Sequence, residues 1–256
     1  MTKPIDVAAY LRRFGYVLNA TRERASGSPL AAARSSTAAF APQPQGGSIT
    51  ESLQLFQRRA GLGVTGELDD ATRRLMETAR CAMPDDAIAA AIPVPWDRRD
   101  LRIAFGDLSG TNVLESDLKA AVLAACQTWE SAGVGLTLTE VNSGEDIRVE
   151  CRPSNDPDFD MTGIVVAHAD YPPGASVIST LPPLPCHFDT TETIWSLDPG
   201  AEEHDVETVA LHEIGHCLGL KHHGNKAAAM YTFMPKGRVQ RVLHSDDLVL
   251  LRDLYP

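Results

Sequence analysis

Apolar residues recur at helical spacing near the start of the chain, stop over a long polar stretch, and then resume. The apolar residues that share one helical face early in the chain are Val7, Tyr10, Leu11, Phe14 and Leu18. Residues 19–47 are rich in Ala, Ser, Pro and Gly and show no apolar period, so they predict a long exposed loop. Residues 48–79 predict two short helices around a glycine-rich turn, the first capped by Ser48. This pattern indicates a three-helix domain of about 80 residues.

The remainder of the chain alternates between strand and helix patterns. The predicted elements are strands at 101–105, 135–141 and 146–151 and helices at 115–133, 201–220 and 244–256. Between residues 152 and 195 the sequence is loop-rich, with short strands. The pattern therefore predicts an α+β domain that follows the helical one.

Composition restricts the function classes. The chain has 256 residues, of which 43% are hydrophobic, so one or two globular domains are expected. A formal net charge of −11 argues against nucleic acid or an anionic membrane as the main partner. No apolar run approaches the length of a membrane span, and no signal peptide is visible in the first residues. The five cysteines, an odd number, leave at least one thiol unpaired in a monomer.

The string "HEIGHCLGLKHH" carries the clearest chemistry. His212 and His216 are four residues apart on a predicted helix, so both imidazoles face one side and can bind Zn²⁺. Gly219 lets the chain leave the helix, and His222 then returns as a third ligand. Three histidines leave a fourth coordination position open for water, which is typical of a catalytic site, and Glu213 is placed to take a proton from that water.

These residues resemble the zinc-binding sequence of the metzincin endopeptidases and, among them, the matrixins. Met230 lies where matrixins place the methionine of the tight turn under the metal, and Asp246 and Asp247 match their last helix. The resemblance implies an α+β metzincin catalytic domain, with a twisted, mostly parallel sheet and three helices, over residues 96–256. Residues 1–81 would then form a small three-helix prodomain, similar to peptidoglycan-binding modules, and residues 82–95 a linker and activation region.

The same resemblance assigns a role to "ARCAMPDD". Matrixin zymogens carry a cysteine switch, in which a thiolate occupies the open position on zinc. Cys81 matches that cysteine, and Arg80 and Asp85 match the residues that form a salt bridge to hold the loop; Pro84 also fits the motif. Two residues depart from the motif, Ala79 and Ala82. Residues 19–47 correspond to the exposed bait loop of matrixins, and activation is expected to cut between 87 and 91.

Further metal sites are implied by the family pattern. For calcium, the expected side-chain ligands are Asp160, Asp189 and Glu192, with backbone carbonyls of Met161, Gly163 and Val165. For a second, structural zinc, His168 and His187 match two family ligands. The other two positions fall on Pro153 and Asn155, which are poor zinc ligands.

Cys151 and Cys186 flank this incomplete second zinc site, and three arrangements are open. They could form a disulfide, which is the preferred hypothesis for an exported protein. Alternatively, Cys151 joins His168 and His187 on a rebuilt zinc site, with Asp156 as a further ligand. In the third arrangement both thiols are free. The histidines at 204, 223 and 244 are interpreted as surface residues.

The function expected from the resemblance is that of a secreted, monomeric zinc endopeptidase, made as a latent zymogen and activated by another protease. It would cut extended protein or peptide substrates with a hydrophobic residue just after the cut, and Thr208 would leave the pocket for that residue fairly open. The alternative hypothesis is a binding module: a protein that binds peptidoglycan and carries a vestigial protease site. The intact Glu213 argues against this alternative, because a vestigial site does not need the base.

Overall fold

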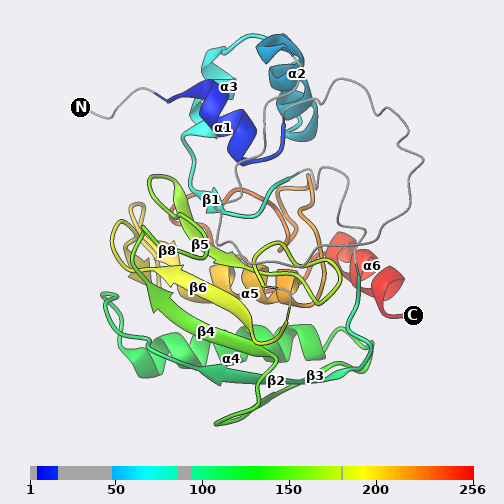
Figure 1. The fold of residues 1–256 in the computed structure, drawn as a ribbon. Coiled ribbons are helices and arrows are strands. Elements are labelled where there is room, and N and C mark those ends of the chain that lie inside the picture. Colours follow the sequence, from blue (N-terminus) through cyan, green and yellow to red (C-terminus); the bar gives the residue numbers. More distant parts are fainter. Residues whose placement is uncertain (1–4, 17–47, 86–93, 180) are drawn as a thin grey trace, which may run out of the picture. The chain divides into compact units, whose positions relative to one another are not determined.

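The computed structural model describes residues 5–16, 48–85, 94–179 and 181–256. The predicted bait loop and the predicted activation cut therefore lie outside the described residues. The chain divides into two compact units, Met1–Met76 and Glu77–Pro256, which are drawn in Figure 1. Among the residues that can be described, no helix is both long and apolar enough to cross a membrane.

The first unit contains three helices: α1 (Val7–Arg13), α2 (Ile49–Arg59) and α3 (Asp70–Met76). Its core is aromatic. Phe56 is fully buried, and its ring lies edge-on to Tyr10, with ring centroids 5.7 Å apart, and to Tyr16, at 5.2 Å. Ser48 caps α2 as predicted, accepting a hydrogen bond from Glu51 N in a capping box. The first helix ends at Arg13, earlier than the apolar pattern suggested, because Phe14 and Tyr16 turn inward to pack in the core.

The second unit is built on a six-stranded sheet with strand order β1-β5-β6-β4-β2-β3 (Figure 1). The strands are β1 (Arg80–Cys81), β2 (Asp100–Phe105), β3 (Thr137–Glu140), β4 (Ile147–Arg152), β5 (Val165–Ala169) and β6 (Leu184–Asp189). The β5–β6 pair is antiparallel, and the other pairs of this sheet are parallel. A small second sheet pairs β7 (Trp195–Ser196) with β8 (His204–Asp205). The expected mostly parallel sheet is confirmed.

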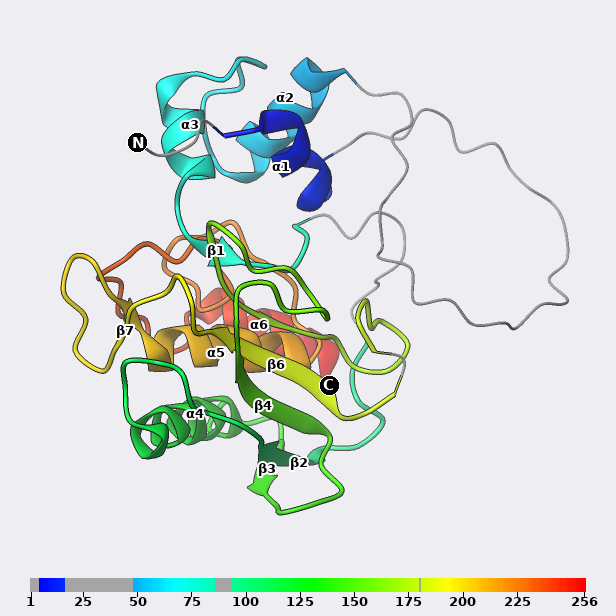
Figure 2. The same cartoon turned by 60° about the vertical axis from the view of Figure 1, so that its left-hand side comes forward.

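Three helices complete this unit: α4 (Glu115–Glu130), α5 (Val206–Cys217) and α6 (Ser245–Leu254). Helices α4 and α5 run side by side against the sheet (Figures 1 and 2), and the Trp129 indole N–H donates to the carbonyl of Leu211 at 2.8 Å. Near the chain end, the Tyr255 hydroxyl donates to the carbonyl of Leu218 at 2.8 Å, which ties the segment after α6 to the end of α5. The α+β fold with three helices is thus as predicted.

The short strand β1 belongs to the second unit. Arg80 N donates to the carbonyl of Ile164 at 2.8 Å, and Ala82 N donates to that of Ala167 at 3.0 Å. These bonds add residues 80–82 to the exposed edge of β5. The sequence interpretation assigned residues 77–81 to the N-terminal domain, whereas in the structure they pack with the second unit because the edge strand binds them.

The predicted Cys151–Cys186 disulfide is wrong for this structure, in which all five cysteines are free and buried. The register of β4 against β6 explains the difference. Cys151 lies opposite Phe188 and Cys186 opposite Val149, so the two thiols are out of register. Cys186 instead shares a hydrogen bond with Cys217, and this bond, together with burial, raises its pKa well above the usual thiol value. The arrangement found is therefore the third one, with both thiols free.

The interpretation of His204 as a surface residue is also wrong. Its residue exposure is only 4%, and its ring lies edge-on to Trp195 with centroids 6.3 Å apart. Burial, with a smaller contribution from the charge of Lys236, lowers the pKa of His204 to about 4. His223 and His244 are partly exposed.

We predict that His204 makes the protein less stable in mild acid. Because the pKa is lower in the folded state, the neutral form stabilises the fold above the unfolded-state value of about 6.5, and this contribution is lost as the pH falls towards 4. Between pH 7 and pH 5 the wild-type chain should lose about 2 kcal/mol more than His204→Phe, which keeps an aromatic ring. Urea unfolding at both pH values measures this, and equal losses would contradict it.

Candidate metal centre

Helix α5 places three polar side chains in a closed environment. Asp205 caps its first turn by accepting a hydrogen bond from Thr208 N at 2.9 Å. His212, Glu213 and His216 follow on the buried side, each at most 1% exposed. Such burial of polar groups is costly unless each group finds a partner, so their partners indicate what the site is built to do.

The chain leaves the helix at Gly219, where φ is +99°. A Cβ atom at this position would lie 2.8 Å from the carbonyl oxygen of Val94, so both the backbone conformation and the space require glycine. The turn brings His222 back beside the helix, and its ring centroid lies 4.8 Å from that of His216 and 5.1 Å from that of His212. The structure thus assembles all three predicted ligands.

Each histidine is oriented through its Nδ1 atom. Nδ1 of His212 donates to the carbonyl of Ala229 at 2.8 Å, and Nδ1 of His216 donates to that of Leu220 at 2.8 Å. Nδ1 of His222 lies 2.7 Å from a carboxylate oxygen of Asp85. With these protons on Nδ1, every Nε2 atom carries a lone pair.

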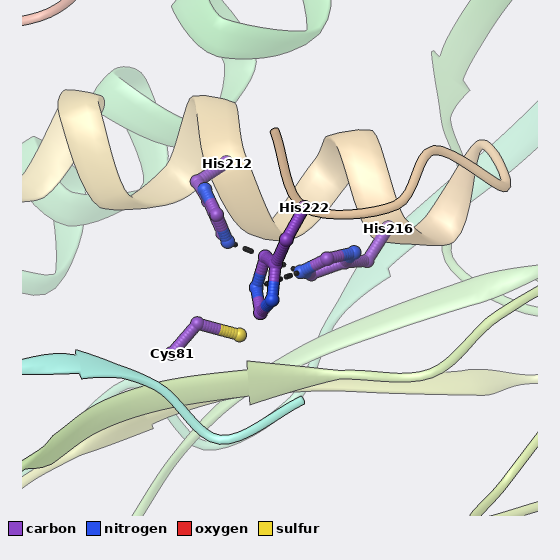
Figure 3. A group of neighbouring side chains, drawn as sticks. All are labelled: Cys81, His212, His216 and His222. Carbon is purple, nitrogen blue, oxygen red and sulfur yellow. Dashed lines mark hydrogen bonds between the residues drawn. The ribbon is translucent and has the colours of Figure 1, made fainter. Parts of the chain in front are cut away.

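The three Nε2 atoms point at one another (Figure 3). Nε2 of His216 lies 3.1 Å from Nε2 of His212 and 3.1 Å from Nε2 of His222. Lone pairs that face each other repel unless a cation lies between them. Burial, followed by the charge of the neighbouring histidines, lowers the pKa of His212 and His216, which keeps these rings neutral and ready to bind metal. The donor set therefore fits Zn²⁺.

Cys81 approaches this point from the opposite side, on β1 (Figure 3). Its sulfur and the three histidine nitrogens all lie within 4.8 Å of one another, which gives a Cys–His₃ set of four donors. Burial, and next the charge of Glu213, raises the pKa of the Cys81 thiol well above its usual value. A cation between the four donors would reverse this effect, since a coordinating thiol is deprotonated.

Glu213 lies next to the four donors without being one of them. One carboxylate oxygen, Oε2, is 3.5 Å from Cys81 Sγ, while the other, Oε1, is buried and has no hydrogen-bond partner in the described part of the chain. Burial raises the pKa of Glu213 to about 8. A buried carboxyl group with an unpaired oxygen beside a metal centre is typical of a group that exchanges protons there.

The loop that carries Cys81 is held by a buried ion pair. The Arg80 guanidinium, fully buried, donates to both carboxylate oxygens of Asp85 at 2.9 Å. It also donates to the carbonyls of Cys81 and Met83, at 3.0 and 3.2 Å. The predicted Arg80–Asp85 pair therefore exists, and it closes the loop around the thiol.

Asp85 makes two further contacts that the sequence did not indicate. Besides His222, its Oδ1 atom accepts a hydrogen bond from the Thr232 hydroxyl at 2.9 Å. Burial alone would raise the pKa of Asp85, but the charge of Arg80 and the hydrogen bond with His222 outweigh it and hold that pKa well below the usual value. The Asp85 carboxylate is thus ionised and joins the loop to two residues on the far side of the metal centre.

Met230 lies beneath the histidines, as the family pattern suggested. A Cβ atom at position 215 would come within 2.3 Å of its sulfur, so the glycine in "HEIGH" allows helix and turn to approach closely. Asp247 holds this turn by accepting hydrogen bonds from Ala229 N at 2.8 Å and Met230 N at 3.0 Å. Asp246 instead accepts a hydrogen bond from the Asn225 side chain.

A second group of potential ligands lies on the antiparallel pair of strands. His168 on β5 is directly opposite His187 on β6. One oxygen of Asp156 lies 3.1 Å from His168 Nε2 and 2.6 Å from His187 Nδ1, and Nδ1 of His168 is buried without a hydrogen-bond partner among the described residues. Cys151, itself described, is not in this group. Asp156, which follows the poor zinc ligand Asn155, therefore supplies the carboxylate of this group. The alternative in which Cys151 is a ligand is wrong.

The expected calcium ligands are only partly brought together. Gly163 N donates to Glu192 Oε2 at 2.7 Å, which connects the two loops. Both oxygens of Asp189 accept hydrogen bonds from its own loop, including one from Glu192 N at 2.9 Å. Asp160 Oδ1 accepts one from Thr162 N at 2.9 Å. Among the described residues, the Asp160, Asp189 and Glu192 carboxylates do not gather within 4.8 Å of one another.

Comparison with known proteins gives a consistent picture. The profile of the matrixin family matches residues 95–256. Matrix metalloproteinase-19 of Homo sapiens is 31% identical over 261 residues, covering 98% of this chain and 45% of the relative. The hatching enzyme of Paracentrotus lividus is 32% identical over 215 residues, covering 81% and 34%, and the interstitial collagenase of Bos taurus is 33% identical over 221 residues, covering 83% and 44%. The chain thus spans less than half the length of these relatives.

We predict that the chain binds two zinc ions, one at each group of donors. Asp156→Asn keeps the shape of the second group but removes the charge of its anionic donor, so it should lose one zinc and keep the other. His216→Ala should affect the first site instead. Metal analysis of the purified variants measures this. A single zinc in both the wild-type chain and Asp156→Asn would make the second group a metal-free hydrogen-bonded cluster.

Proposed function

The chain belongs to the matrixin family, and from that premise we propose that it is a zinc-dependent endopeptidase held latent by its own Cys81. The observation that carries this proposal is the convergence of three Nε2 lone pairs and one thiol sulfur on one buried point, with the Glu213 carboxyl group beside the sulfur. Three histidine ligands and one replaceable ligand are the pattern of a catalytic zinc site.

In this proposal His212, His216 and His222 hold the metal. When bound, Zn²⁺ supplies Lewis acidity towards water and towards a peptide carbonyl. Glu213 does not bind the metal: its carboxylate accepts a proton from the attacking water and later delivers it to the leaving nitrogen. Glu213 is buried beside the donor group and is not one of its ligands, which suits a carboxyl group that takes a proton and returns it.

Latency follows from the same geometry. The Cys81 sulfur lies 3.5 Å from Glu213 Oε2, so it fills the space in which a water molecule would meet the base. The loop is held in place by the pairing of β1 with β5 and by the contacts of Asp85 with His222 and Thr232, while the Arg80–Asp85 pair keeps the loop closed. We therefore propose that cleavage of the linker, followed by release of residues 80–85, activates the enzyme.

Other parts of the proposal rest on the family alone. The substrates are proteins or peptides that bind in extended form, and secretion is the setting in which relatives of this kind act. Calcium bound by the loops of Asp160, Gly163, Asp189 and Glu192 would stabilise the fold. Peptidoglycan as a partner of the N-terminal unit remains a prediction.

Replacing the proposed base tests the chemistry. The wild-type and variant enzymes are first activated by cleavage of the linker. Glu213→Gln keeps the shape of the side chain but cannot accept a proton, so kcat/KM on a fluorogenic peptide should fall by about 10³-fold relative to the activated wild-type enzyme. The zinc content should not change, because Glu213 is not a ligand. Glu207→Gln, on the same helix, is the matched control and should stay active. Loss of zinc together with activity would instead make Glu213 a structural residue.

Removing the switch thiol tests latency. The full chain should be nearly inactive, and Cys81→Ala should cleave peptide without prior processing, because no sulfur then occupies the space next to Glu213. Cys126→Ala, which removes another buried thiol, should remain latent. The measurement is the rate of peptide cleavage by the uncut wild-type, Cys81→Ala and Cys126→Ala chains. If Cys81→Ala were as inactive as the wild-type chain while the processed enzyme is active, the switch assignment would be wrong.

A further inference from the structure

The contacts of Asp85 define a binding site for a carboxylate. Part of this site belongs to the catalytic unit and remains when the switch segment leaves. Two donors reach Asp85 from the catalytic unit, His222 Nδ1 at 2.7 Å and the Thr232 hydroxyl at 2.9 Å. Two more come from Arg80, which lies on the switch segment itself. When that segment leaves, Arg80 and Asp85 leave together, and His222 and Thr232 remain.

Both remaining donors belong to the catalytic unit. In the latent chain the His222 side chain is 2% exposed, and its ring lies beside those of His212 and His216. Thr232 is 7% exposed and lies two residues after Met230, whose turn is tied to helix α6 by Asp247. In the latent chain, Asp85 is the hydrogen-bond acceptor of the Thr232 hydroxyl. Release of the switch therefore takes the Asp85 carboxylate away from two donors that are already in place.

We propose that, in the active enzyme, His222 and Thr232 form a subsite that accepts the acidic side chain of an Asp or Glu residue of the substrate. This inference rests on the proposed endopeptidase function and extends it to substrate selection. The physical reason is that two directed donors favour an anionic oxygen over a neutral amide, because a charged acceptor makes the stronger hydrogen bond.

The site lies beside the reacting centre. Cys81, one of the four donors around the metal position, and Asp85, which occupies the carboxylate subsite, are four residues apart on one loop. An extended substrate that places its scissile bond at the metal can therefore bring a side chain to His222 and Thr232. Residues 91–256 contain 12 Lys and Arg against 25 Asp and Glu, so the processed enzyme repels acidic peptides at long range, but that effect is the same for every variant below.

The experiment compares two substrates on three enzymes. The wild-type chain, Thr232→Val and Thr232→Ser are activated by limited proteolysis in the linker and supplied with peptides in which each position around the scissile bond is in turn Asp or Asn. All peptides have amidated C-termini, so that only a side chain can supply the carboxylate. A parallel set with free C-termini shows whether a terminal carboxylate uses the same donors.

For the wild-type enzyme we expect one position at which Asp raises kcat/KM about fivefold or more over Asn. Thr232→Val, which has the same shape without the hydroxyl, should reduce this ratio to near one, and Thr232→Ser should restore it. The rate on the Asn peptide serves as the reference within each enzyme, so the ratio for Asp over Asn is compared and not the absolute rate. Because the long-range electrostatic repulsion is the same in all three enzymes, it cancels when their ratios of kcat/KM for Asp over Asn peptides are compared.

Two results would overturn the proposal: no position at which Asp is preferred over Asn, or a preference of the same size in Thr232→Val. A preference only for free C-termini would assign the donors to a terminal carboxylate and would also overturn it. In each of these cases cleavage of the Asn peptides shows that the proposed endopeptidase function holds. If no peptide is cut by any of the enzymes, the proposed function itself fails.

Discussion

The structure depends on the hydrogen bond made by the Nδ1 atom of each metal-binding histidine. An imidazole can present a lone pair at Nε2 only if its proton resides on Nδ1, and here two carbonyl oxygens and one carboxylate fix that proton. These acceptors come from three different places: the turn before Met230, the end of helix α5, and the switch loop. Three features are required to place these acceptors: the tight turn at Met230, the turn at Gly219 after helix α5, and the switch loop paired with the edge of β5.

Packing provides the precision that this arrangement needs. Gly215 has no side chain, and Trp129 and Met230 lie so close to it that any Cβ would collide with both. Helix α4 is tied to α5 through the Trp129 indole, and α6 holds the turn through Asp247. The metal-binding helix is thus fixed from below by apolar contact and from the side by buried hydrogen bonds, which limits the movement of its histidines.

Sequence reasoning succeeded where the chemistry is local. The spacing of His212 and His216 and the glycine at 219 fix geometry over a few residues, so the sequence alone is enough to name the ligands of the first metal site. Sequence reasoning failed where strands meet. The register of β4 against β6, which separates Cys151 from Cys186, cannot be read from either strand alone. The approach of Thr232 to Asp85 likewise depends on long-range folding and was not predicted. Asp156 was named as a further ligand beside His168 and His187, and the structure brings these three residues together.

The carboxylate of Asp85 has a consequence for how the protein acquires its metal. Groups that hold a metal-binding histidine in place typically change metal affinity by about 10–100-fold, and Asp85 holds one of the three. The latent chain offers four donors and three oriented rings, whereas the processed enzyme has lost both a thiol and an orienting carboxylate. In the proposed zymogen, the intact chain would then compete better for scarce zinc than the processed enzyme. The switch loop would thereby help the chain to take up its metal before activation.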